Sequence, residues 1–311
     1  MTALVGLATD VTEHGFPSRS ARTYRVLIGG SAGFRVTFHG VRGSTPCHGD
    51  DIVRYGGNTS CVSLDVPGAS PILFDMGTGL RYFGATQPHD GSFRGTCLLT
   101  HMHWDHTQGL PFFTPMLKPG AELDVYAPRQ DDGRSVTDVF QSIICPPLFP
   151  ITLDQWPGSF RFFDVGDDEF SIGDARVMAR VVPHVGVTLG YRVEWNGIRV
   201  AYISDHQQPH DGSFRASGGA LELARDVDLL IHDSQYTPDE FARKFDWGHC
   251  TVDYAVWFAG QCRARKLALF HHDPTRSDEA IDALGECAAK AGRLMGLEVI
   301  TAREGLTVEL G

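Results

Sequence analysis

Short apolar runs dominate the chain from Phe34 onward, and turn-forming residues separate one run from the next. Runs of this length, bounded by Gly, Pro, Asp or Ser, are typical of β-strands. Residues 1–33 are polar and weakly patterned, so we expect a tail or an edge addition there, followed by a single domain over 34–311. The pattern predicts strands at residues 34–40, 60–66, 71–77, 95–101, 160–166, 175–184, 188–195, 198–205 and 227–233.

Helical periodicity is present in three segments, residues 135–144, 251–262 and 277–295. Thr251 and Ser277 are placed as N-caps of the second and third. The third also has acidic residues in its first turn and an apolar stripe that consists of Ile281, Leu284, Ala288 and Ala291. Many strands with interspersed helices predict a layered α/β sandwich.

Composition narrows the classes of protein to consider. The chain has 311 residues, is 42% hydrophobic and has no apolar stretch near the roughly 18 residues that span a bilayer. The N-terminal residues contain no long apolar segment, so we expect no secretory signal and a soluble, cytoplasmic protein. The seven cysteines are scattered without a CxxC pair, which favours free thiols over a disulfide framework or a thiolate zinc site. A net charge of −11 disfavours extended binding to nucleic acid.

An identical octapeptide, QPHDGSFR, occurs at residues 87–94 and again at 208–215. Asp75 and His101 flank the first copy, and Asp205 and His232 flank the second at nearly the same spacing. One hypothesis is that the chain has two similar halves, each with an Asp at one strand end and a His at the next. The alternative is a copied surface loop, because Asp-Gly-Ser is common in turns.

The densest cluster of ligand-type residues is HMHWDH, directly after the apolar run CLLT. Residues two apart on a strand point to one face, so His101 and His103 project together. After the turn, Asp105 and His106 are placed to reach a second ion. Three imidazoles and a carboxylate suit zinc, manganese or iron better than calcium or magnesium.

These six residues match the HxHxDH motif, and over residues 34–311 the chain resembles the metallo-β-lactamase superfamily. It is most similar to the branch that includes ribonuclease Z and phosphodiesterases. The segments that carry the likeness to a bacterial subgroup of that branch are FHGVRGSTP, YGGNTSC and HWDHTQGLPFF. The resemblance implies a four-layer αβ/βα sandwich and a centre with two metal ions.

The resemblance also implies the remaining metal ligands. His184 would complete the first metal site with the first two histidines of the motif, and Asp205 would bridge both ions. His271 would complete the second site with the last two residues of the motif, while its neighbour His272 is a candidate for an outer contact. Each of these residues follows an apolar strand, where α/β folds gather functional groups.

Four further residues have roles implied by the family pattern. Asp75 in LFDMGTG would support the metal loop. Asp105 is the expected proton acceptor, His249 would protonate a leaving oxygen or hold a phosphate oxygen, and Asp233 would orient His249. The alternative is that Asp233 and His249 form a buried pair that fastens a loop, and the functional role is favoured over it. The sequence departs from the family in having Cys250 where serine is common.

The most favoured activity is hydrolysis of a small or cyclic phosphodiester by a hydroxide held between two divalent cations, with zinc expected and manganese or iron as alternatives. Other candidates are tRNA 3′ processing, hydrolysis of a lactone or ester, and an iron-dependent sulfur dioxygenase or other redox module. The segment 114–158 is apolar and more typical of a pocket wall or lid than of an RNA-binding arm, so nucleic acid is not expected as a partner. The apolar residues Phe112, Phe113, Leu148 and Phe149 are interpreted as a pocket wall or a homodimer contact.

Overall fold

Two seven-stranded β-sheets lie at the centre of the computed structural model, which describes residues 33–311. The prediction for residues 1–33 falls outside that range except for Gly33. The first sheet has the strand order β14-β1-β2-β3-β4-β5-β6 and the second has β13-β12-β11-β10-β9-β8-β7. The strands of the first sheet are β1 (Phe34–Gly40), β2 (Cys61–Asp65), β3 (Ile72–Phe74), β4 (Arg94–Leu98), β5 (Glu122–Pro128), β6 (Ser159–Val165) and β14 (Thr307–Leu310). Those of the second are β7 (Glu169–Ile172), β8 (Ala175–Val181), β9 (Leu189–Trp195), β10 (Ile198–Ile203), β11 (Leu229–Asp233), β12 (Lys266–Phe270) and β13 (Glu298–Thr301).

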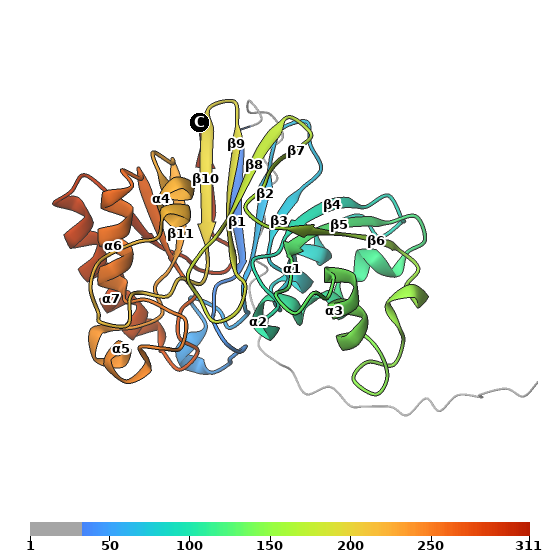
Figure 1. The fold of residues 1–311 in the computed structure, drawn as a ribbon, viewed down its shortest axis with the longest axis horizontal. Coiled ribbons are helices and arrows are strands. Elements are labelled where there is room, and N and C mark those ends of the chain that lie inside the picture. The colour runs from blue at the N-terminus through green and yellow to red at the C-terminus, as the bar shows by residue number, and fades with distance from the viewer. Residues whose placement is uncertain (1–32) are drawn as a thin grey trace, which may run out of the picture. The chain divides into compact units, whose positions relative to one another are not determined.

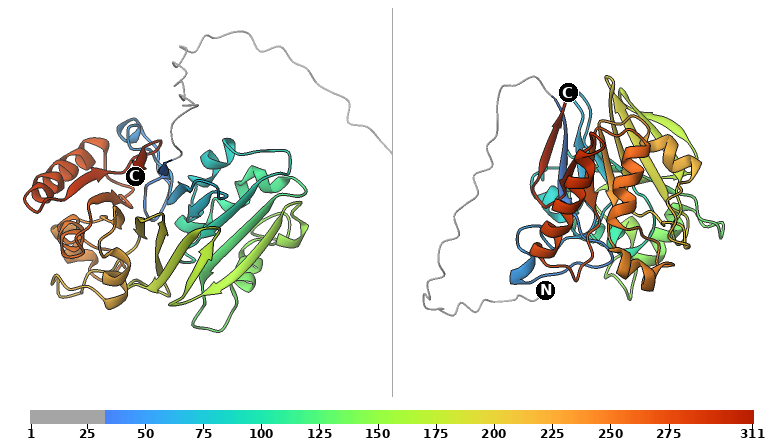
Figure 2. Two further views of the ribbon diagram at one scale, coloured as in Figure 1. Left: turned by 90° about the horizontal axis from the view of Figure 1, so that it is seen from above. Right: turned by 90° about the vertical axis from the view of Figure 1, so that its left-hand side faces the viewer.

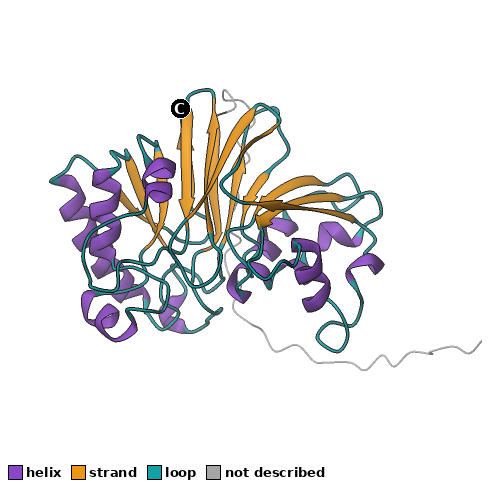
Figure 3. Ribbon diagram, in the orientation of Figure 1, coloured by secondary structure: helices purple, strands orange, loops and turns teal. Residues whose placement is uncertain are grey.

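Helices cover the outer faces of both sheets (Figures 1 and 3). They are α1 (Leu80–Ala85), α2 (Trp104–Thr107), α3 (Val136–Ile143), α4 (Gly218–Ala224), α5 (Pro238–Lys244), α6 (Val252–Gln261) and α7 (Asp278–Arg293). Helices α1 and α3 pack on the first sheet, and α4, α6 and α7 pack on the second. Between the sheets, aromatic side chains interlock, as in the stack of Phe74 on Tyr202 at 4.6 Å between ring centroids. The predicted four-layer αβ/βα sandwich is therefore confirmed; Figure 2 shows the sheets from two further directions.

The strands and helices with strong periodicity are where the sequence predicts them. All nine predicted strands are present, and the side chains of Ser135, Thr251 and Ser277 cap their helices by accepting backbone N–H groups. The nine ranges omitted the strands β5, β7, β13 and β14, and β12 was expected only as the apolar strand before His271. The prediction also omitted α1, α2, α4 and α5, which have only four to seven residues each and so show little of the helical period.

The apolar stripe predicted for α7 is partly wrong. Ile281 and Ala288 are buried, but Ala291 is exposed and Gly292 is buried instead. A Cβ on Gly292 would lie 2.6 Å from Cγ2 of Val299 in β13. Close contact between helix and sheet at this turn therefore selects glycine rather than a larger apolar residue.

The two halves of the fold share a strand order. In one half, β1, β2 and β3 are antiparallel and β3 to β6 are parallel; in the other, β8, β9 and β10 are antiparallel and β10 to β13 are parallel. This part of the hypothesis of two similar halves is confirmed.

The octapeptides themselves do not occupy equivalent places. Both form the same turn, in which a serine N–H donates to the Asp side chain two residues earlier, at 2.9 Å in one copy and 3.0 Å in the other. The first copy, however, joins α1 to β4, whereas the second joins β10 to α4. The proposed match of His101 with His232 is also wrong, because His101 lies beyond the end of β4 while His232 lies within β11, against Phe258 of α6.

The segment 114–158 is not a lid. It contains β5 and α3, so much of it is part of the first sheet and its helical cover. Phe113 is fully buried against Phe83 and Phe93 and belongs to the core, whereas Phe112 and Leu148 are exposed. A dimer contact at the exposed pair stays a prediction. No helix within residues 33–311 has the length and apolar character needed to cross a membrane.

Candidate metal centre

The structure brings the seven predicted ligands together from the carboxyl ends of four strands. His101 and His103 follow β4, and Asp105 and His106 lie in the first turn of α2, at the lower centre of Figure 1. The other three follow strands of the second sheet: His184 follows β8, Asp205 follows β10 and His271 follows β12. Both sheets therefore contribute to one cluster of side chains, in which three groups of ligand-type atoms lie within 4.8 Å: His101, His103 and His184; His101, His106 and Asp205; and Asp105, His106 and His271.

The first group has three imidazole nitrogens that face one another. Nε2 of His101 lies 2.8 Å from Nδ1 of His103, and that Nδ1 lies 3.3 Å from Nε2 of His184. Two nitrogens bound to one tetrahedral zinc ion at 2.0–2.1 Å would be roughly 3.3 Å apart. The distances of 2.8 and 3.3 Å are close to the spacing of ligands on a shared cation.

The group of Asp105, His106 and His271 joins a carboxylate to two imidazoles. Oδ2 of Asp105 lies 3.2 Å from Nε2 of His106 and 3.1 Å from Nε2 of His271. Asp205 lies between the two groups. Its Oδ1 is 3.2 Å from Nε2 of His106, and its Oδ2 is 3.6 Å from Nε2 of His184. One oxygen of Asp205 thus faces each group, which is the arrangement expected of a bridging ligand.

Two atoms at the middle of the cluster have no hydrogen-bond partner among residues 33–311. They are Nε2 of His106 and Oδ1 of Asp205, and both are buried. A buried polar atom without a partner is costly, and a cation between them would satisfy both. The nitrogen and carboxylate donors of this cluster therefore fit the binding of divalent metal ions.

Asp75 holds the imidazole of His106 from behind. Its Oδ2 accepts the Nδ1–H of His106 at 2.7 Å and the hydroxyl of Tyr202 at 2.8 Å. Its Oδ1 accepts the backbone N–H of Thr100 at 2.8 Å and the hydroxyl of Thr100 at 2.9 Å. Because Nδ1 of His106 donates to Asp75, Nε2 is the nitrogen that faces the cluster. The structure thus places Asp75 where the supporting role predicted for it requires.

Gly248 fixes the orientation of His184. The backbone carbonyl of Gly248 accepts the Nδ1–H of His184 at 2.6 Å, which turns Nε2 toward the cluster. Gly248 has a φ of 97°, and a Cβ at this position would lie 2.4 Å from the imidazole. Only glycine allows this carbonyl to approach the ring.

The local environment keeps the imidazoles of the first group neutral and the two carboxylates of the cluster ionised. Burial lowers the pKa of His101 and His103, and it lowers that of His184 to about 4, so these imidazoles are neutral, as metal ligands must be. Burial would raise the pKa of Asp105 and Asp205, but the imidazoles of His106 and His271, whose own pKa these carboxylates raise, outweigh it and hold both well below their usual range. The carboxylates are therefore ionised and available to a cation.

Asp233 and His249 form the predicted pair at the edge of the cluster. Oδ2 of Asp233 accepts the Nδ1–H of His249 at 2.9 Å and the backbone N–H of His206 at 3.0 Å. The ring of His249 stacks on that of His271 with 5.0 Å between centroids. The thiol of Cys250 donates to the backbone carbonyl of Asp233, so the departure from serine lies behind the pair and not in the centre.

His272 does not contact the cluster. Its Nε2 donates to the backbone carbonyl of Ala302 at 2.9 Å, and its ring packs edge-on against Tyr55. His271 has a φ of 59°, and its side chain lies among the predicted ligands. The expectation of an outer contact by His272 is therefore wrong.

Sequence reasoning missed two residues that contact the predicted ligands. Gln235 accepts the Nδ1–H of His271 at 2.8 Å, and the backbone N–H of Ser44 donates to Oδ2 of Asp105 at 2.6 Å. Ser44 lies in FHGVRGSTP, a segment already singled out, and Gln235 lies two residues after Asp233. No spacing rule distinguishes them from ordinary turn residues.

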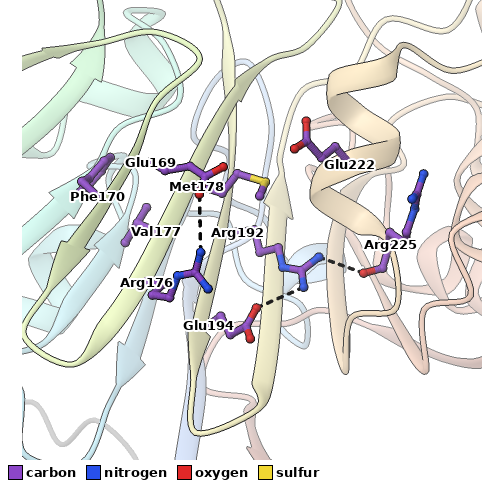
Figure 4. A pocket seen from close by; sticks show the side chains of 9 residues that line it. All are labelled: Glu169, Phe170, Arg176, Val177, Met178, Arg192, Glu194, Glu222 and Arg225. Carbon is purple, nitrogen blue, oxygen red and sulfur yellow. Dashed lines mark hydrogen bonds and ion pairs between the residues drawn. The ribbon is translucent and has the colours of Figure 1, made fainter.

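The cluster opens to solvent beside His103, which is exposed. Three apolar side chains are adjacent in sequence to the residues at this opening: Trp104 is 67% exposed, Val185 51% and Trp247 61%. Figure 4 shows a second hollow between β7, β8, β9 and α4, where Glu169 pairs with Arg176 and Glu194 pairs with Arg192. None of the predicted ligands lines that hollow, so it does not compete as the functional site.

An αβ/βα sandwich whose strand ends gather histidines and aspartates into one cluster suited to metal binding is the architecture of the metal-dependent hydrolases with the metallo-β-lactamase fold. The chain belongs to this superfamily, since the family described as the beta-lactamase superfamily domain matches residues 71–272.

Among curated relatives, the ribonuclease Z of Natronomonas pharaonis is 26% identical over 303 residues, which cover 81% of this chain and 93% of that protein. The uncharacterized protein Mb1374 of Mycobacterium bovis is 25% identical over 244 residues, which cover 73% of this chain and 78% of that protein.

Solved structures share the fold. The metallo-β-lactamase fold protein YhfI of Bacillus subtilis has a TM-score of 0.67 at 18% identity, and the human short-form tRNase Z has 0.60 at 23%. Each alignment covers 89% of this chain and 99% of the other. A diphosphatase from the PhnP family has a TM-score of 0.62 at 19% identity, with 89% of this chain and 98% of that one covered.

Proposed function

We propose that this chain is a phosphodiesterase with two divalent cations, zinc in the first instance, that hydrolyses a small or cyclic phosphodiester. The position of Asp205 is the observation that carries the proposal, because its two oxygens face two separate groups of ligands. Two adjacent cations lower the pKa of a bound water and neutralise charge on the entering and leaving oxygens of a phosphodiester. The first cation would be held by His101, His103 and His184, the second by Asp105, His106 and His271, and both by Asp205.

Asp105 would accept the proton of the attacking water. Its contacts to Ser44, His106 and His271 all involve Oδ2, which leaves Oδ1 for that proton. The carboxylate is ionised in this environment, as a proton acceptor must be.

His249 would protonate the leaving oxygen. Its Nδ1 donates to Asp233, so its Nε2 is the nitrogen that can serve the substrate. Asp233 is fully buried and also accepts backbone N–H groups of His206 and Gln235, which fixes the carboxylate and through it the ring. A general acid in this position contributes on the order of 10²–10⁴-fold to the rate.

The opening of the site favours a small substrate. The exposed side chains that neighbour it in sequence, Trp104, Val185 and Trp247, are apolar rather than cationic. Lys244 lies above the ring of Trp247, but its ammonium group is paired with Asp273 at 3.3 Å. A large polyanion would gain little from such an opening, since phosphate contacts with Lys and Arg dominate its binding.

A second candidate is tRNA 3′ processing, which the similarity to proteins named ribonuclease Z over 81% of the chain supports. Because of this similarity, nucleic acid is kept as a candidate substrate, contrary to the expectation from the sequence. Hydrolysis of a lactone or ester, and iron-dependent sulfur oxidation, are the remaining alternatives.

The test is to reconstitute metal-free protein with zinc, manganese or iron and to supply each class of substrate. Those substrates are bis-p-nitrophenyl phosphate, cyclic nucleotides, a lactone, a thioester and a precursor tRNA. We expect hydrolysis of the small phosphodiesters, lost on chelation and in Asp205→Ala. Preferred, salt-sensitive cleavage of precursor tRNA would establish the second candidate, and oxygen consumption with a persulfide and iron would refute hydrolysis.

A further inference from the structure

We propose that Gln235 and Ser44 are positioning residues that set the affinity of the second cation position, formed by Asp105, His106 and His271, without affecting the first. This inference rests on the two-cation centre of the proposed function. It concerns a glutamine in the loop after β11 and a serine in the loop after β1.

Gln235 fixes the imidazole of His271. Its Oε1 accepts the Nδ1–H of His271 at 2.8 Å, so Nε2 is the nitrogen that faces Asp105, at 3.1 Å from Oδ2. The glutamine is itself held at both ends of its backbone. Its N–H donates to Oδ1 of Asp233 at 3.0 Å, and its carbonyl accepts from Arg276 at 2.7 Å. Gln235 is 3% exposed, so water does not compete for its side chain.

Ser44 connects this glutamine to the carboxylate of the same cation position. The Nε2 amide of Gln235 donates to Oγ of Ser44 at 3.3 Å, and the backbone N–H of Ser44 donates to Oδ2 of Asp105 at 2.6 Å. The side chains of His271 and Asp105 are thus linked by a chain of hydrogen bonds through Gln235 and Ser44. Gln235 and Ser44, which are not ligands themselves, therefore set the distance between these two ligands.

The buried side chain of Arg42 holds the loop that carries Ser44 in place. Arg42 is fully buried, and its guanidinium donates to the backbone carbonyls of Gly56, Asp273 and Arg276. A Cβ on Gly43 would lie 2.4 Å from the imidazole of His271, so only glycine lets the loop lie against that ring.

Backbone strain concentrates at the second cation position. Within residues 33–311, six residues other than glycine have a positive φ, and three of them, Ser44, Asp75 and His271, contact or belong to this position. Strained residues of this kind persist only where surrounding contacts hold them.

The first cation position has no such connection. Its ligand His184 is oriented by the backbone carbonyl of Gly248, and neither Gln235 nor Ser44 makes a hydrogen bond to any of its three histidines in the described residues. Loss of the Gln235 side chain should therefore weaken one ion and spare the other.

Zinc binding to metal-free protein, measured by competition with a chromogenic chelator and by metal content after gel filtration, tests the proposal. In Gln235→Leu we expect one zinc to bind about 10–100-fold more weakly, as for other residues that support metal ligands, and the other to stay within about twofold. Gln235→Glu keeps an acceptor for the His271 proton and should restore most of the lost affinity. Ser44→Gly keeps the backbone N–H at a positive φ and should lower the affinity only slightly.

Gln108→Leu is the matched control, because this glutamine lies two residues from His106 but contacts Thr59 rather than a ligand. Unchanged affinity for both ions in Gln235→Leu would overturn the proposal. An equal loss of both ions together with a lower melting temperature of the metal-free protein would also overturn it, because the role would then be structural. A wild-type protein that binds fewer than two zinc ions would instead refute the two-cation centre.

Discussion

Asp75→Asn is the substitution whose effect the structure predicts most fully. Asp75 is fully buried and accepts four hydrogen bonds, from Thr100 through its N–H and hydroxyl, from Tyr202 and from His106. An asparagine has nearly the same shape but replaces one acceptor oxygen with an NH₂ donor. The substitution therefore changes the hydrogen bonding while leaving the packing intact.

The least costly arrangement turns the new NH₂ group toward Thr100. The hydroxyl of Thr100 can accept from it, but the backbone N–H then loses its acceptor, at a cost of about 1–3 kcal/mol. The bonds from His106 and Tyr202 then go to a neutral oxygen, and each weakens by about 1 kcal/mol. The total is about 3–5 kcal/mol, which for a domain of this size corresponds to a fall in melting temperature of roughly 6–10 °C.

The assay is thermal and urea unfolding of the metal-free protein, with zinc affinity measured alongside. Tyr202→Phe is the matched control, because it removes one donor and leaves the carboxylate its other three; about 1 kcal/mol should be lost. If Asp75→Asn is no less stable than Tyr202→Phe and binds zinc like the wild type, the carboxylate does not hold His106 as described.

Three other outcomes follow from single contacts. Gly248→Ala should weaken zinc binding at the first cation position at least tenfold, because its Cβ would lie 2.4 Å from the ring of His184. The zinc content of the variant after dialysis measures this loss. A variant that keeps its full zinc content would contradict the prediction. Burial lowers the pKa of His232 from 6.5 to about 4, so the unfolded chain binds more protons between these values and stability falls as pH drops through this range. In urea unfolding of the metal-free protein, the free energy of unfolding should rise with pH up to about 1.4 kcal/mol per pH unit more steeply than in His232→Gln. Equal dependence on pH in the two proteins would contradict this prediction. Trp247→Ala should raise the KM for bis-p-nitrophenyl phosphate about tenfold with little change in kcat, because an aromatic side chain stacks on aromatic groups of a substrate. Tyr82→Ala, at another exposed aromatic residue, is the control and should alter neither constant. An unchanged KM in Trp247→Ala would show that Trp247 does not contact the substrate.

The predicted parts of the fold are those with a strong local signal. Residues 34–40 alternate between buried and more exposed positions and form β1 as expected, and Ser277 caps a helix whose first turn is acidic. The strands β13 and β14 have four residues each, mostly half-buried or exposed, and their pairing partners are distant in sequence. Nothing local distinguishes such segments from loops.

The same contrast holds at the candidate site. The motif from His101 to His106 is recognisable because four ligand-type side chains fall within six residues. Gln235 and Ser44 are 191 positions apart and are brought together only by the packing of one sheet against the other. A glutamine after a strand and a serine in a loop have no unusual spacing, so the folded structure is needed to connect them.

The candidate ligands come from both sheets, and this has a consequence for the lifetime of the protein. Cations held between the loop after β4 and the loops after β8, β10 and β12 would act as cross-links across the sandwich. At a cation concentration one thousand times the Kd, such binding adds about 4 kcal/mol to the stability of the folded chain. In a cell short of the metal, the same chain would open more often at this edge and be degraded sooner, so its abundance would follow the supply of its cation.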